Sequence, residues 1–238
     1  MWQNKSNTFV ISFFLLLLID VVSVAGGFQH IHFWTKPLLM PVLAIFLATR
    51  LKGNNSSVWY FTLAGILFAW AGDIFLLFEY KNPSFFLFGL GSFLATHICY
   101  ILLFKKLLKT YPGWWVKKGW LWMAVVGYAV ILMVILWHSL GGMKIPVTVY
   151  ALCISVMVIL SLRLQPGMEN MTWIYFSLGA FLFFISDSIL ALNKFLQPVE
   201  LAGPAIMLTY GLAQYLITAG TVKYFGSATR RVVGVPGE

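Results

Sequence analysis

Eight long apolar segments run through this sequence, and they constrain its fold more than any other feature. A membrane-spanning helix needs about 20 apolar residues, each adding a rise of about 1.5 Å. The segments that meet this requirement are 9–28, 34–51, 58–79, 84–104, 119–138, 145–163, 172–193 and 203–224. The sequence therefore predicts an all-α polytopic membrane helix bundle of about eight transmembrane helices. We expect residues 1–238 to form a single transmembrane helical domain.

The composition agrees with this class and excludes several others. Of the 238 residues, 61% are hydrophobic and 10% are charged, whereas a soluble domain is nearer half apolar and a quarter charged. These values exclude a disordered chain, a disulfide scaffold and an ordinary soluble enzyme. Both cysteines, Cys99 and Cys153, lie inside apolar segments and are interpreted as small core residues. No basic stripe is interleaved with exposed aromatic residues, so no nucleic-acid partner is expected.

The lysines and arginines predict how the bundle is oriented. Eight spans place both termini on one side, here called side A, and the opposite side is side B. Side A carries twelve of the sixteen lysines and arginines, and side B carries four. The positive-inside rule then places side A and both termini in the cytoplasm, with a bacterial inner membrane as the expected location. A cleaved signal peptide ending at Ala25 is the alternative for the first segment, but Asp20 favours a retained helix.

A weak internal repeat relates the third and fourth segments to the seventh and eighth. Gly72-Asp73-Ile74-Phe75-Leu76 and Ser186-Asp187-Ser188-Ile189-Leu190 correspond at an offset of 114 residues. At the same offset Gly89 corresponds to Gly203, near the start of the following segment in each case. This pattern predicts two equivalent hairpins within two parallel four-helix halves.

The scarce acidic residues indicate where the chemistry lies. Three of the seven, Asp20, Asp73 and Asp187, lie within apolar segments, where a carboxylate costs several kcal/mol and marks a functional site by default. All three belong to odd-numbered segments and fall in the half of the membrane toward side B. We therefore expect Asp73 and Asp187 to lie at similar depth and to be brought together by bundle packing. A purely structural, hydrogen-bonded carboxylate is the alternative, and it is stronger for Asp20.

Other polar side chains are expected near the same layer. Candidates for substrate binding are Lys36, His97, Tyr100, Tyr150, Tyr210 and Gln214. Gln214 shares a helical face with Tyr210, since the two are four residues apart. The alternatives are an interfacial lysine for Lys36, a satisfied core histidine for His97, and inter-helix polar contacts for the others. His30 and His32 form a His-x-His in a side-B loop, but no further ligands follow at metal-site spacing, so no metal is expected.

Two classes of function fit these residues. Two carboxylates in a semi-dry cavity can divide acid and base roles without a metal or organic cofactor, which favours an intramembrane hydrolase acting on a lipid. Carboxylates in repeated halves are also typical of a proton-coupled transporter of small molecules or lipids. Against the transporter, the sequence shows no clearly broken mid-membrane helix. A retinal-binding receptor is disfavoured because Lys194 and Lys223 lie at segment ends rather than in the middle of the last helix.

The order and spacing of several short motifs resemble the YhhN family of eight-helix membrane proteins, which includes the lysoplasmalogenases. The matching pieces are Lys36-Pro37, Gly72-Asp73-x-x-Leu76, Phe93-x-x-x-His97-x-x-Tyr100, Pro146-x-x-x-Tyr150, Ser186-Asp187-x-x-Leu190-Ala191 with Lys194-Phe195, and Tyr210-x-x-Ala213-Gln214. Their order and spacing cover nearly the whole span from residue 36 to residue 224. Asp20, His30 and His32 lie outside the pattern.

This resemblance implies an activity, namely hydrolysis of the sn-1 vinyl-ether bond of lysoplasmalogens. The products would be a fatty aldehyde and glycerophosphoethanolamine or glycerophosphocholine, with no metal or organic cofactor required and a lysophospholipid substrate arriving from the bilayer. Protonation of a vinyl ether at its β-carbon gives an oxocarbenium ion, which an adjacent carboxylate stabilises. Asp73 and Asp187 are therefore the predicted catalytic pair, with Lys36 expected to hold the phosphate. His97, Tyr150, Tyr210 and Gln214 are expected to position water or the vinyl ether.

Overall fold

The computed structural model describes residues 2–111, 119–165 and 167–233. Within these residues the chain forms eight α-helices and one short 3-10 helix, η1 (Gly141–Met143). The α-helices are α1 (Trp2–Ala25), α2 (Gln29–Arg50), α3 (Ser57–Leu77), α4 (Ser84–Thr110), α5 (Gly119–Leu136), α6 (Lys144–Leu162), α7 (Asn170–Phe195) and α8 (Ala202–Val233). Seven of the described helices are long and apolar enough to cross a membrane, and α5 is shorter. The predicted all-α polytopic bundle is confirmed.

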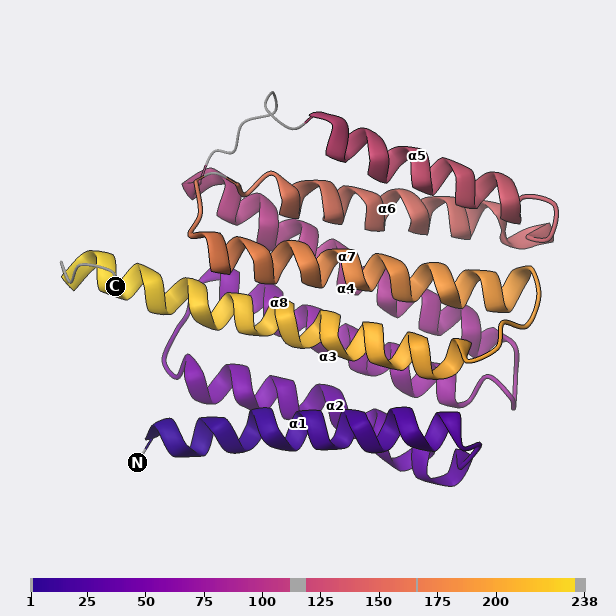
Figure 1. The fold of residues 1–238 in the computed structure, drawn as a ribbon, viewed down its shortest axis with the longest axis horizontal. Coiled ribbons are helices and arrows are strands. Elements are labelled where there is room, and N and C mark those ends of the chain that lie inside the picture. Colours follow the sequence, from indigo (N-terminus) through magenta and orange to yellow (C-terminus); the bar gives the residue numbers. More distant parts are fainter. Residues whose placement is uncertain (1, 112–118, 166, 234–238) are drawn as a thin grey trace.

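The helices form a central group with a helix pair on each flank (Figure 1). Helices α3, α4, α7 and α8 occupy the centre, where α3 packs most extensively on α4 and α7 on α8. On one flank, α1 and α2 contact α8 and α3, and on the other, α6 contacts α4 and α7. Both ends of the chain lie at the same end of the bundle, which is side A. The two hairpins of the predicted repeat are therefore the central pairs.

The connection between α1 and α2 is shorter than the sequence predicts. Segment 9–28 actually ends at Ala25, and segment 34–51 begins as early as Gln29. The reversal is possible in so few residues because Gly27 adopts a φ of +72°, in the left-handed region that favours glycine. The polar residues of this connection mask the helix start when apolar character alone is used to find it.

The early start of α2 places two prolines inside the helix rather than at its beginning. A proline has no N–H, so the carbonyl four residues before it loses its helical donor. Pro41 removes the donor for the carbonyl of Pro37, and the indole Nε1 of Trp70 donates to that oxygen instead, at 2.8 Å. This hydrogen bond joins α2 to α3 close to the residues of the predicted site.

Two helices continue well beyond their predicted ends on side A. Helix α4 reaches Thr110 rather than residue 104, and α8 reaches Val233 rather than residue 224. The hydropathy pattern marks only the part of a helix that lies in hydrocarbon. Beyond it, lysines such as Lys105, Lys106 and Lys109 extend α4 into an aqueous or interfacial layer, where charge is tolerated.

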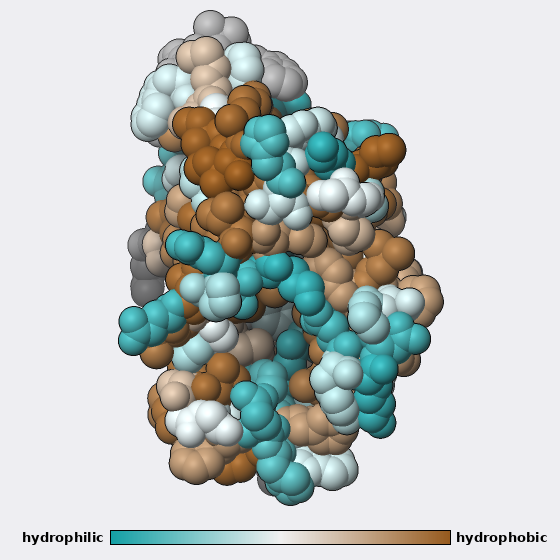
Figure 2. Space-filling model, turned by 90° about the vertical axis from the view of Figure 1, so that its right-hand side faces the viewer, coloured by the Kyte–Doolittle hydropathy of each residue, from teal (hydrophilic) through white to brown (hydrophobic). Residues whose placement is uncertain are grey.

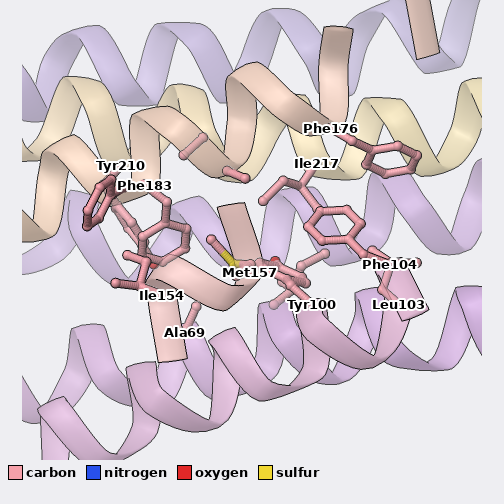
Figure 3. Packing of buried hydrophobic residues seen from close by; sticks show 14 of the residues in the cluster. Ala69, Tyr100, Leu103, Phe104, Ile154, Met157, Phe176, Phe183, Tyr210 and Ile217 are labelled. Carbon is pink, nitrogen blue, oxygen red and sulfur yellow. The ribbon is translucent and has the colours of Figure 1, made fainter. Parts of the chain in front are cut away.

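Buried side chains from α3, α4, α6, α7 and α8 meet along the centre of the bundle (Figure 3). Tyr100 of α4 is fully buried there, and its hydroxyl donates to Oε1 of Gln214 at 2.6 Å. The ring of Tyr100 lies directly against Gly65 of α3, where any Cβ would overlap its Cε1 atom. The close approach of α3 and α4 therefore depends on a glycine at this position.

Replacing that glycine is expected to destabilise the bundle. In Gly65→Ala the added methyl group overlaps a ring that its hydrogen bond to Gln214 holds in place, and overpacking of this kind costs about 1–3 kcal/mol. The midpoint of thermal unfolding in detergent should fall by several degrees. Gly91→Ala in α4 is the matched control, because a Cβ there meets nothing within 4 Å. Equal unfolding temperatures for the two variants would contradict the packing argument.

Candidate active site

A cavity opens at the side-B end of the bundle, between the central helices and the α1–α2 pair. Its volume is about 210 Å³. Figure 2 views this end of the molecule and shows a hollow with hydrophilic side chains in and around it. The lining residues are Val24, His32, Lys36, Asp73, Leu76, Glu79, Phe93, Ser186, Asp187, Leu190, Gly203, Ile206, Met207 and Tyr210. Six helices thus contribute to one chamber that combines an apolar wall with a small set of charged groups.

A second hollow adjoins the cavity on its outer side and is here called the vestibule. It has a volume of about 550 Å³ and is lined by Gln29, His32, Lys36, Leu76, Leu77, Glu79, Tyr80, Pro83 and Lys194. His32, Lys36, Leu76 and Glu79 line both spaces. At this mouth the ammonium of Lys194 in α7 forms an ion pair with Glu79, which follows α3. The vestibule is therefore the polar approach to the inner cavity.

Asp73, near the end of α3, is the more deeply buried of the two predicted catalytic carboxylates, with 1% of its surface exposed. The hydroxyl of Tyr210 in α8 donates to its Oδ2 atom at 2.7 Å. The ammonium nitrogen of Lys36 in α2 lies 3.9 Å from its Oδ1 atom. A hydroxyl donor and a cation therefore face the two oxygens of this carboxyl group.

Asp187 in α7 lies in the same cavity with a different set of partners, and 13% of its side chain is exposed. The hydroxyl of Tyr150 in α6 donates to its Oδ2 atom at 2.6 Å. Nε2 of His97 in α4 lies 3.0 Å from the same oxygen. Because both contacts are made to Oδ2, the Oδ1 atom remains for a molecule in the cavity.

The two contacts of His97 define where a proton resides. Nδ1 lies 2.6 Å from the backbone carbonyl of Phe93, and a carbonyl can only accept, so Nδ1 carries a hydrogen and donates it. The 3.0 Å contact between Nε2 and Asp187 then also requires a hydrogen, held either by the ring or by the carboxyl group. His97 and Asp187 therefore share one exchangeable proton at the cavity wall.

The structure divides the predicted site residues into three groups. Lys36, Asp73, Asp187 and Tyr210 line the cavity. His97 and Tyr150 lie behind the lining and contact Asp187. Tyr100 and Gln214 are fully buried and lie outside the cavity lining. They are hydrogen-bonded to each other, which joins α4 to α8.

Sequence reasoning missed part of this site. Ser186 belongs to a recognised motif without an expected role, and Glu79 is only the last residue of the apolar segment 58–79. His32 is predicted only as part of a His-x-His in a side-B loop, with no metal expected there, whereas it lies in α2 and contacts the buried Asp20. A correct start for α2 would have revealed it, because His32 and Lys36 are then four residues apart on one helical face. Among the described residues, no three His, Cys, Asp or Glu side chains are grouped as a metal site requires.

Comparisons with known proteins identify a family and several relatives. The model of the YhhN family matches residues 31–221. A lysoplasmalogenase of Mycobacterium bovis is 34% identical over 197 residues, which is 79% of this chain and 71% of that protein. Lysoplasmalogenase TMEM86B of Sus scrofa is 28% identical over 187 residues, covering 78% of this chain and 74% of its own. Lysoplasmalogenase TMEM86A of Homo sapiens is 31% identical over 163 residues, which is 67% of this chain and 64% of that protein.

No solved structure matches the chain. The family match includes every cavity-lining residue except Val24, and it leaves out Asp20. It covers the greater part of the sequence, including both membrane-embedded carboxylates of the cavity. The chain therefore belongs to the YhhN family of integral membrane proteins.

Proposed function

We propose that this protein is a membrane-embedded lysoplasmalogenase, which hydrolyses the sn-1 vinyl-ether bond of a lysoplasmalogen to a fatty aldehyde and a glycerophospho-base. The observation that carries the proposal is that Asp73 and Asp187 line one cavity with different partners. Vinyl-ether hydrolysis needs a group that gives a proton and a carboxylate that stabilises positive charge. Relatives named lysoplasmalogenase over most of this chain support the same activity.

The different partners suggest different roles for the two carboxyl groups. Asp187, which shares a proton with His97, is proposed as the acid that protonates the β-carbon of the vinyl ether. Asp73, which faces the Lys36 ammonium, is proposed as the carboxylate that stabilises the resulting oxocarbenium ion. Asp73 then accepts a proton from the water that adds to the former vinyl carbon, and a hemiacetal results.

Collapse of the hemiacetal restores both groups. Asp73 returns its proton to the glycerol oxygen as the bond between that oxygen and the former vinyl carbon breaks. Asp187 regains a proton from the hemiacetal hydroxyl as the aldehyde carbonyl forms. The net reaction consumes one water molecule, and each carboxyl group ends in the state in which it began, much as the carboxyl pair of a glycosidase does.

The surroundings of the cavity support the proposal that the substrate is a lysophospholipid that arrives from the bilayer. Apolar side chains of the lining, such as Leu190, Ile206 and Met207, suit an alkenyl chain. Lys36, Glu79 and Lys194 line the vestibule, and these charged groups suit a polar head group. The excess of lysines and arginines on side A supports cytoplasmic termini, which would place the opening of the cavity at the opposite membrane surface.

Replacing either carboxyl group should abolish turnover. Asp73→Asn and Asp187→Asn are each expected to lower aldehyde release from a lysoplasmalogen by at least about a hundred-fold, because each removes a proton donor or acceptor. The measurement is an aldehyde assay on purified protein, with unfolding temperature reported for each variant. Glu200→Gln, an exposed carboxyl outside the cavity, is the control and should retain activity. Near-normal turnover in both aspartate variants, or substrate-driven proton flux in vesicles without aldehyde, would reject the proposal.

Protonation at carbon predicts an isotope label in the aldehyde product. When the reaction runs in D₂O, the aldehyde should carry one deuterium on the carbon next to its carbonyl, because the acid delivers its proton there. Mass spectrometry of the trapped aldehyde measures this incorporation. Buffered product incubated without enzyme controls for slow exchange. Aldehyde without deuterium would exclude the proposed acid step.

The shared proton makes His97 a positioning residue for Asp187. His97→Gln is expected to reduce kcat by about ten- to a hundred-fold, the effect of losing a hydrogen bond to a charged group. KM should change little, since His97 does not line the cavity. His138→Gln, in a separate groove between α5 and α6, serves as the control. A rise in KM with an unchanged kcat would contradict this role.

A further inference from the structure

A third membrane-embedded carboxylate lies beside the cavity and has no part in the proposed reaction. Asp20 in α1 is fully buried, and a carboxylate at this depth in apolar surroundings marks a functional hypothesis. Nδ1 of His32 donates to its Oδ1 atom at 2.9 Å, and the hydroxyl of Thr35 donates to the same oxygen at 2.5 Å. Both donors come from the first turns of α2. The contact between Asp20 and His32 therefore holds the His32 ring in one orientation against α1.

This orientation determines which atom of His32 is free for the cavity. Asp20 occupies Nδ1, so Nε2, on the opposite edge of the ring, is the remaining polar atom. His32 lines both the inner cavity and the vestibule. Lys36 follows one helical turn later on the same face and also lines both spaces. Two side chains with hydrogen-bond donors thus stand at the junction between the inner cavity and its mouth.

We infer that His32 and Lys36 form the binding site for the substrate's phosphate group, with Asp20 as the residue that positions His32; this rests on the proposed function. A protonated imidazole donates from both nitrogens, so Nδ1 can serve Asp20 while Nε2 serves a phosphate oxygen. The Lys36 ammonium has three N–H donors, and only one of its sides faces Asp73. Charge-assisted donors of this kind are the strong ones for phosphate.

The location of Lys36 agrees with the order of the groups along the substrate. Lys36 touches Asp73 on its inner side and the vestibule on its outer side. A phosphate beside Lys36 therefore places the glycerol backbone, and the vinyl ether attached to it, next to the carboxylate that acts on it. The carboxylate that lines the vestibule, Glu79, is paired with Lys194. Its charge is therefore compensated and does not repel the phosphate.

The competing explanation is that the Asp20–His32 contact is purely structural and only holds α1 against α2. A pair of substrates distinguishes this explanation from the phosphate site. One substrate is a lysoplasmalogen, and the other is the corresponding 1-alkenylglycerol, which has the vinyl ether but no phosphate. In His32→Gln the ratio of kcat/KM for the first substrate to that for the second should fall about ten-fold, the loss of one charge-assisted hydrogen bond. Asp20→Asn should shift the ratio in the same direction by a smaller factor.

His30→Gln is the matched control, since His30 is exposed two residues away and does not line the cavity; its ratio should equal that of the wild type. A loss shared equally by both substrates in His32→Gln would overturn the inference in favour of a structural or acid–base role. An unchanged ratio, with or without a change in stability, would overturn it as well.

Binding gives a readout that does not depend on turnover. Titration calorimetry with glycerophosphocholine should show binding to the wild type that weakens about ten-fold in His32→Gln. Equal binding to both proteins would overturn the phosphate site even if the enzyme is active, whereas wild-type binding without any turnover would reject the proposed function alone. Inorganic phosphate tests the other source of the same group. If it competes fully at equal concentration, the site recognises free phosphate rather than a lipid head group, and the assignment fails.

Discussion

A carboxylate buried among apolar helices needs hydrogen-bond donors or a counter-charge, and the central helices of this bundle are arranged to supply them. Asp73 in α3 receives its hydroxyl donor from Tyr210 in α8, and Asp187 in α7 is contacted by His97 in α4. Each carboxylate of one hairpin is therefore satisfied by the other hairpin. Leaving such a group without a partner costs about 1–3 kcal/mol or more. Separation of the two hairpins would therefore be unfavourable, because each carboxylate would lose a partner.

The predicted repeat is consistent with a further contact that crosses between the two hairpins. Tyr100 and Gln214 are hydrogen-bonded to each other and are 114 residues apart, the offset that relates Asp73 to Asp187. Two residues that are equivalent in a repeat and also touch must lie close to the axis that relates the halves. Because α3 and α7 run in the same direction, the axis of the predicted repeat would follow the membrane normal, as the axis of parallel repeats does.

The sequence was sufficient to predict the class of fold, since continuous apolar runs leave few alternatives to a helix bundle. It was also sufficient to find the two carboxylates, because charge inside an apolar run is rare and conspicuous. Helix ends were less predictable. The start of α2 moved by five residues to Gln29, and with it His32 moved from a loop to the face that carries Lys36. The distances to the helix ends also differ from those predicted, because Asp73 is four residues from the end of α3 and Asp187 is eight from the end of α7, although both line the same cavity.

Contacts between distant segments could not be read from the sequence. Tyr100 and Tyr210 are both tyrosines within central helices, yet Tyr100 donates to Gln214 and Tyr210 donates to Asp73. Only the packing of the central helices α3, α4, α7 and α8 decides between these outcomes. In the same way, nothing in the first segment shows that Asp20 meets His32, because that contact depends on the tight turn at Gly27.

The repeat also suggests how two equivalent carboxyl groups acquire different chemistry. Lys36 contacts Asp73, Tyr150 contacts Asp187, and these two partners are themselves 114 residues apart. At one position of the repeat, therefore, one half places an ammonium and the other half a hydroxyl. An ammonium favours a charged neighbour, whereas a phenol can donate to a carboxyl group in either protonation state. A symmetric pair of carboxyl groups would compete for one proton, and the exchange of lysine for tyrosine gives each of them the separate role that acid–base hydrolysis requires.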